Sequence, residues 1–186
     1  MDSFQYKPLL QLKEFSVNKP VGTIKTTPNT FIVQELVYNG NEVLRAVPLS
    51  ERTEIHGGSH NEGFTLFNLT KRGFNTEKAL REVARQLRTD FDSVSYHGLK
   101  DRNALTSQEI AVRGRYFPRF SHRSIFLTQV TEEMPSELLC GGNAGNRFAI
   151  EVKTDAKNIP YSALERVPNF FGKQRIGSNE SCEVGR

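Results

Sequence analysis

The hydrophobic and polar positions of this 186-residue chain follow two periods, and the clearer of the two is helical. Between Thr76 and Leu87 the apolar residues return every three or four positions and leave the charged side chains on the opposite side. A stripe with this spacing predicts an amphipathic helix, and Asn75 or Thr76 suits its cap. We therefore expect a helix that begins near Thr76, buries its leucines and its valine, and exposes Arg81 and Arg85.

A period of two is typical of half-buried strands, and it marks the segment that follows Asn146. Three large apolar residues there alternate with small or charged ones: Phe148, Ile150 and Val152. Segments rich in β-branched and aromatic residues predict further strands at 31–37, 64–70 and 106–112. Because strands and helices mix irregularly instead of alternating, the pattern predicts an α+β fold.

The remaining segments are irregular. Proline and glycine break any periodicity in residues 1–22, which we expect to form an extended arm. The polar, glycine-rich stretch 47–63 predicts a long loop. A short helix from about Tyr161 is expected to end near Val167, because Pro168 disfavours helical geometry in the residue before it.

Composition agrees with a soluble domain and excludes a few classes of protein. The chain is 37% hydrophobic with 13 Phe and no Trp, which suffices for a core. No apolar run approaches the length needed to cross a membrane, and the N-terminus lacks the basic start and apolar stretch of a secretory signal. These features predict a cytoplasmic protein, or a nuclear one if the source is eukaryotic, with no membrane partner.

Residues that could bind a metal are few. Cys140 and Cys182 are too sparse for a disulfide framework or a metal site, so we expect free thiols in a reducing compartment. His56 and His60 are four positions apart, a spacing that suits metal ligands on a helix. Two glycines between them argue against a helix, so we expect exposed loop histidines and no metal site.

The net charge of +4, from 25 basic and 21 acidic residues, permits nucleic-acid binding without arguing strongly for it. One basic cluster stands out, because no acidic residue lies between Glu109 and Glu132. Four arginines there are interleaved with aromatic residues: Arg113, Arg115, Arg119 and Arg123 with Tyr116, Phe117, Phe120 and His122. Arginine contacts phosphates and rings stack on bases, so the cluster is a candidate RNA surface. An ordinary connector with its rings turned inward fits the same composition.

The strongest candidate for chemistry is the stretch from Gly98 to Gln108, where Asp101 lies between Lys100 and Arg102. Nearby positive charge favours the ionised form of a carboxylate, which suits a nucleophile or a base. Asp101 is predicted on the loop that enters the next strand, where a rigid element can hold a catalytic group. Local composition alone fits a solvated loop of ion pairs better.

Five short blocks that follow one another along the chain change that balance. They are Pro28, Phe31, Val33 and Glu35; Gly63 with Lys71, Gly73, Asn75 and Thr76; Gly98, Lys100, Asp101, Arg102, Ala104, Thr106 and Gln108; Gly145 to Phe148; and Val167 to Gly177. In this order and spacing they resemble the blocks of the TruD-type tRNA pseudouridine synthases, over roughly residues 20 to 186.

The resemblance implies a pseudouridine-synthase-like sheet flanked by helices, and an isomerase that converts uridine 13 of tRNA to pseudouridine without a cofactor. It implies Asp101 as the catalytic carboxylate, acting as a nucleophile or as a base. It places Phe31, Asn146 and Phe148 in the uridine pocket. Candidate phosphate contacts, from the resemblance and from the basic cluster, are Lys25, Lys100, Arg102, Arg113 and Arg115. Residues expected to brace the site are Glu35, Gln108, Gln174 and Arg175.

The chain departs from the family pattern at three places. Thr30 stands where the family has an aspartate. The family's basic run before Gly145 is replaced by 136–144, which holds no cation and includes Glu137, so we expect weaker RNA binding. Family members also continue past the last block into an insertion domain and then complete the catalytic sheet. We therefore expect 1–186 to be a single domain, the N-terminal part of a TruD-type catalytic domain, without the insertion domain and the C-terminal catalytic strands.

Two other functions remain open. A catalytically degenerate RNA-binding module, or an inactive fragment of this fold, would need only a basic groove that binds tRNA or another structured RNA. A protein-interaction or structural domain on the same scaffold would need neither that groove nor Asp101. The isomerase needs both Asp101 and an intact pocket.

Overall fold

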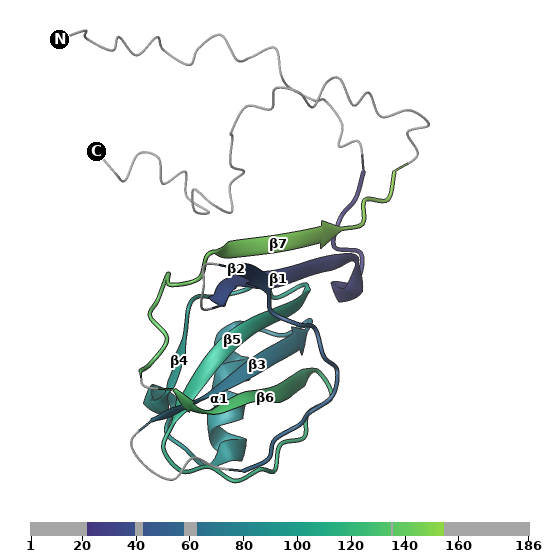
Figure 1. Ribbon diagram of the computed structural model, residues 1–186. Helices are drawn as coiled ribbons and strands as arrows, with labels where there is room; N and C mark the ends of the chain where they lie inside the picture. Colours follow the sequence, from purple (N-terminus) through teal and green to yellow (C-terminus); the bar gives the residue numbers. More distant parts are fainter. Residues whose placement is uncertain (1–21, 40–42, 58–62, 135, 155–186) are drawn as a thin grey trace, which may run out of the picture. The chain divides into compact units, whose positions relative to one another are not determined.

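The computed structural model describes residues 22–39, 43–57, 63–134 and 136–154, which form a mixed sheet with one α-helix against it (Figure 1). In chain order the described elements are η2 (Pro28–Thr30), β1 (Phe31–Asn39), β2 (Val43–Ala46), β3 (Phe64–Arg72), α1 (Thr76–Leu87), η3 (Phe91–Ser93), β4 (Val94–Tyr96), β5 (Leu105–Arg113), β6 (Ile125–Met134) and β7 (Gly145–Ile150). The predicted α+β class is confirmed. The predicted arm up to residue 21, the predicted helix near 161–167, His60, Cys182, Gln174 and Arg175 lie outside the described residues.

The sheet has seven strands, and its central path runs β2, β1, β5, β3, β6. β3 pairs antiparallel with one edge of β5 along the whole length of β5. Two other strands share the second edge of β5. β1 pairs with that side in parallel over Ile32–Gln34, and β4 pairs with it further along, at Ile110–Val112. β1 therefore leaves β5 after Gln34, and the sheet forks at Glu35.

α1 covers the face formed by β3, β5 and β6, as its pattern predicted (Figure 1). Leu80, Val83 and Leu87 are fully buried, which stabilises the fold by roughly 1.5–3 kcal/mol for each side chain. The Asn75 side chain accepts a hydrogen bond from the Lys78 amide and caps the first turn. No helix of the described residues is long and apolar enough to span a membrane.

Among the described residues, part of the opposite face of the sheet is covered by the start of the irregular segment 47–57. The Ser107 hydroxyl donates to the Val47 carbonyl at 2.6 Å, and the Ser50 amide donates to Thr70 Oγ1 at 3.1 Å. β5 is consequently buried on both faces, from Thr106 to Val112. Within its described part, the predicted long loop is confirmed, with one isolated bridge from Glu54 to β6.

β7 differs from its prediction. The strand exists, but neither of its faces is buried, and its large apolar side chains lie at the surface: Phe148 is 50% exposed, Ile150 43% and, just beyond the strand, Val152 52%. β7 pairs with β1, whereas the helix-covered core is built on β3, β5 and β6. The cover that α1 gives to the middle of the sheet therefore does not extend to β7, and the predicted burial of this strand is wrong.

Candidate functional site

The loop that carries Asp101 runs between β4 and β5, and its backbone is fastened on both sides. Gln108 on β5 donates through Nε2 to the Gly98 carbonyl at 3.0 Å. Thr76, the first residue of α1, accepts from the Lys100 amide and donates to the Lys100 carbonyl, both at 3.0 Å. The Asp101 backbone is therefore held between a buried strand and the start of a helix, as a catalytic group requires. Gln108, which was expected to brace the site, therefore contacts the loop that carries Asp101.

Lys71, at the end of β3, contacts the backbone of the same loop through its side chain. Its side chain is fully buried, and Nζ donates to the Asp101 carbonyl at 2.7 Å and approaches the Lys100 carbonyl at 3.4 Å. Burial lowers the pKa of Lys71 to about 8; the charge of Asp101 opposes this shift and that of Lys100 adds to it. Two residues further on, the Gly73 amide donates to the Ala104 carbonyl at 3.0 Å.

Lys100 was predicted as a phosphate contact, and the structure directs it inward instead. Its Nζ lies 2.7 Å from Glu35 Oε1, and the two side chains are 5% and 0% exposed. The second oxygen of Glu35 accepts from the Glu109 amide at 2.9 Å, at the fork between β1 and β5. Lys100 is consequently a buried structural cation that links the loop to β1. An ammonium group so enclosed does not meet an RNA phosphate. Glu35, which was expected to brace the site, thus links the Asp101 loop to β1 and β5.

The Asp101 carboxylate is partly exposed, and its ion partner is Lys25 rather than a neighbour in sequence. Lys25 Nζ lies 2.7 Å from Asp101 Oδ1, with side-chain exposures of 26% and 31%. Lys25 also adopts a left-handed backbone conformation with φ of 58°, which is uncommon outside glycine. Lys25 was predicted to contact phosphate; in the structure its ammonium lies on the candidate catalytic group.

The predicted pocket residues lie on the same side of the sheet as this ion pair. Lys25 Nζ is 4.1 Å from the centre of the Phe31 ring, and that ring is 6.2 Å from Phe148 in an edge arrangement. Phe148 is opposite Val33 and Asn146 is opposite Glu35 in the β1–β7 register. Because alternate residues of a strand share a face, Asn146 and Phe148 lie on the side of Phe31. The structure thus brings Asp101, Lys25 and the two rings together.

The remaining predicted phosphate contacts are exposed but do not all belong here. Arg102 follows Asp101 directly. Arg113 ends β5, the strand that begins beside the Asp101 loop, and Arg115 follows it. At about 3.3 Å per residue, Arg113 is roughly 26 Å along the strand from Leu105. The two arginines of the basic cluster therefore lie at the far end of the strand from the Asp101 loop.

The segment 136–144, where the family has a basic run, lies against β4 and β1. The Leu138 amide donates to Ser95 Oγ at 3.0 Å, and the Gly141 amide donates to the His97 carbonyl at 2.7 Å. Glu137 and Cys140 are exposed.

Across the described part of the chain no three His, Cys, Asp or Glu side chains lie close enough to hold a metal ion, and His56 is exposed.

Lys71 and Thr76 also contact the Asp101 loop, but the sequence identified them only as members of a spaced block and assigned them no role. Their spacing, Lys-x-Gly-x-Asn-Thr over residues 71–76, was the signal. It places a lysine at the end of β3 and a threonine at the start of α1, so that both reach the backbone of the Asp101 loop.

The chain is similar to known proteins in both sequence and structure. The family model for tRNA pseudouridine synthase D (TruD) matches residues 15–186. Proteins named tRNA pseudouridine synthase D from Nitratiruptor and Shewanella oneidensis are 32% and 31% identical, over 87% and 90% of this chain. These alignments cover 43% and 44% of the relatives, so the chain spans about two fifths of their length. A crystal structure of a protein from Methanosarcina mazei that carries the same family name matches with a TM-score of 0.59 at 26% identity, over 84% of this chain and 35% of that one.

Proposed function

Since the chain belongs to the tRNA pseudouridine synthase D (TruD) family, we propose that it forms part of an isomerase that converts a uridine of tRNA, the one at position 13, to pseudouridine. Asp101 is the proposed catalytic carboxylate. The observation that carries the proposal is the Asp101 loop, whose backbone is held by Gln108, Thr76 and Lys71 while its carboxylate stays accessible beside two aromatic rings.

The reaction breaks the bond between N1 of the base and C1′ of the ribose, turns the base, and joins C5 to C1′. The C5 proton is released and N1 gains a proton, so the product is an isomer and no electrons are transferred. The proposed role of Asp101 is to attack C1′ or to remove a proton that assists cleavage, and an ionised carboxylate serves either step. The reaction needs no cofactor.

The target base must leave its stack for its C1′ atom to reach a carboxylate held on the protein. In this proposal the half-exposed Phe148 ring offers an apolar surface to the base, the buried Phe31 ring packs edge-on against it, and the Asn146 amide can donate to and accept from a base edge. Lys25 has two available positions in this proposal: on the Asp101 carboxylate, as in the free protein, and on a phosphate when RNA is bound.

The test uses the full-length protein and an unmodified tRNA transcript. Pseudouridine is mapped after incubation, and Asp101→Asn serves as the inactive comparison. We expect modification at one uridine by the parent and none at a comparable rate by the variant. An Asp101→Asn protein that modifies tRNA as fast as the parent would contradict the assignment of Asp101.

A second candidate is an RNA-binding module without turnover. It is favoured by Thr30 in place of the family's aspartate and by the exposed Glu137 in place of a basic run. The same assay separates the two functions, because such a module binds the transcript and leaves every uridine unmodified.

A further inference from the structure

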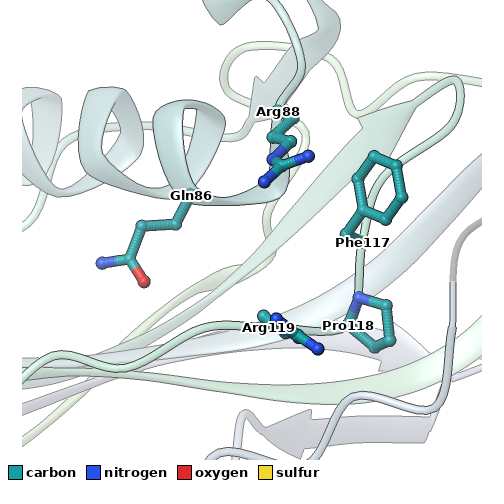
Figure 2. Close-up of a pocket in the computed structure, with 5 residues that line it drawn as sticks. All are labelled: Gln86, Arg88, Phe117, Pro118 and Arg119. Carbon is teal, nitrogen blue, oxygen red and sulfur yellow. The ribbon is translucent and has the colours of Figure 1, made fainter.

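A pocket of about 500 Å³ lies at the C-terminal end of α1, away from the Asp101 loop. Its lining residues come from the last turn of the helix and from the connector between β5 and β6: Gln86, Arg88, Phe117, Pro118 and Arg119 (Figure 2). Sites that hold small organic ligands have volumes in this range, and a nucleotide base is a ligand of that size.

The connector is held in place, so the pocket is formed before any ligand arrives. Tyr116 and Phe120 are buried in the core on either side of the three pocket residues. Gln86 binds the Ser121 backbone twice, accepting from its amide at 2.9 Å and donating to its carbonyl at 3.1 Å. Residues 117–119 are therefore anchored on both sides and remain exposed between two buried rings.

The chemistry of the pocket combines an aromatic face with positive charge. The Phe117 ring is 43% exposed, and the Arg88 guanidinium lies 4.9 Å from its centre. Arg119 lies across the pocket from Arg88 (Figure 2). No acidic residue lines the pocket among those described, and none occurs between residues 110 and 131. A ring beside two guanidinium groups suits a base and its phosphate.

Arg88 has a further feature that favours a ligand. It caps α1 in the left-handed conformation, with φ of 57°, at the position where helices most often have glycine. The backbone of an arginine in this conformation is strained relative to that of glycine. The exposed Arg88 side chain lies over the Phe117 ring in a cation–π contact. Backbone strain of this kind is common where a side chain has a binding role.

We propose that this pocket binds one unpaired nucleotide of the RNA substrate, with its base stacked on Phe117 and its phosphate bound by Arg88 and Arg119. The inference rests on the proposed function, which supplies the RNA. A helix of 12 residues is about 18 Å long, so the nucleotide is a different one from the uridine at Asp101. The pocket would thus fix the position of the tRNA on the enzyme at a second point.

The test measures binding of the full-length protein to an unmodified tRNA transcript over a series of salt concentrations. Phe117→Ala is expected to weaken binding at least about 5-fold without changing the slope of log K against log salt, because stacking releases few ions. Arg88→Gly and Arg119→Ala are each expected to weaken binding and to reduce that slope by about one. Arg88→Gly removes the guanidinium and relieves the backbone, so loss of folding does not explain its effect.

Arg52→Ala is the matched control, because Arg52 is an exposed cation on the segment that covers the other face of the sheet. It is expected to leave both affinity and slope unchanged. Parental affinity in Phe117→Ala, or a parental slope in Arg88→Gly, would overturn the proposal and assign the pocket to a different partner. An equal loss in Arg52→Ala would also overturn it, since the effect would then be one of net charge alone.

The result is separable from the fate of the proposed function, because binding and pseudouridine formation are measured on the same samples. If tRNA is bound and no uridine is modified, the isomerase assignment fails and the binding series still decides the role of the pocket. If uridine is modified while all pocket variants bind as the parent does, this inference fails alone.

Discussion

The two ends of α1 use cations in opposite ways. At its beginning, Lys71 and Lys100 are buried and donate to backbone carbonyls and to Glu35, so their charge positions a loop. Just past its end, Arg88 and Arg119 are exposed beside an open pocket. A buried charge must be paired and is expensive to disturb, whereas an exposed one contributes little to folding and is free to meet a ligand. Exposure to solvent, and not the number of cations, therefore separates the structural role at one end of α1 from the proposed binding role at the other.

The largest expected effect falls on Asp101. Asp101→Asn keeps the size of the side chain but removes the anion, so we expect pseudouridine formation by the full-length protein to fall about a thousandfold or more. Binding of tRNA should persist, since the variant removes a negative charge from an RNA-facing site. Single-turnover assays and a binding titration check the two parts. Parallel loss of binding and rate would show that Asp101 serves binding and not the chemical step.

The next effect concerns stability at the beginning of the helix. Lys100→Met leaves the Glu35 carboxylate buried without its cation, which should reduce the free energy of unfolding by about 3–5 kcal/mol. The double variant Lys100→Met with Glu35→Gln should recover much of this loss, because the amide oxygen can still accept from the Glu109 amide. Urea denaturation measures both. A single variant as stable as the parent would contradict the structural role of the pair.

The third prediction concerns Lys71, which makes the free energy of unfolding depend on pH. A lysine of an unfolded chain titrates near 10.4, while Lys71 in the folded protein has a pKa of about 8. Between these values the unfolded chain holds more protons at this position, so this lysine makes the free energy of unfolding rise with pH, by on the order of 3 kcal/mol at most. Lys71→Met should lack this rise. Denaturation of both proteins from pH 7 to 10 tests it, and a difference that does not vary with pH would contradict the lowered pKa.

The smallest effect is expected past the end of the helix. Arg88→Gly should leave the free energy of unfolding unchanged or raise it by up to about 1 kcal/mol, because glycine adopts the left-handed conformation without strain. Arg88→Ala should be slightly less stable than Arg88→Gly. Thermal melting of the three proteins is sufficient. A clear loss of stability in Arg88→Gly would show that this arginine is structural, and the contrast between the two ends would disappear.

The elements with long or strong patterns were predictable from sequence. α1 has three full turns of apolar stripe, and β1, β3 and β5 are nine-residue strands rich in β-branched and aromatic residues. β2, β4 and β6 were not predicted. β2 and β4 have four and three residues, too few for a period to show in the sequence. Each pairs with an edge that β1 or β5 leaves free beyond the fork. The exposure of β7 was unpredictable for the converse reason, since alternation does not say whether anything covers the apolar side.

The candidate site follows from the spaced blocks, but not all of its contacts do. These blocks point to Asp101, and in the structure its ion partner Lys25 lies over the Phe31 ring, which is in edge contact with Phe148. The flanking cations were expected to face RNA or to stabilise Asp101, yet Lys100 turns inward and Lys25, 76 residues away in sequence, meets the carboxylate. Proximity in sequence fixes neither the direction of a long side chain nor its burial, and both are decided by strands that only the folded sheet brings together.

The fork of the sheet also has a kinetic consequence. The unit of β3, α1, β4 and β5 is continuous in sequence, whereas β1 meets β5 through three residue pairs, such as Val33 with Thr106, more than 70 positions apart. Because contacts that close so long a loop form slowly, we expect β1 to join late in folding and to be among the first elements to separate when the native protein fluctuates. Lys25, Phe31 and Glu35 travel with β1, and Asp101 and Lys100 stay with β5. The candidate site is thus assembled at the last joint to close, and amide hydrogen exchange in β1 should report its opening before the core of α1 exchanges.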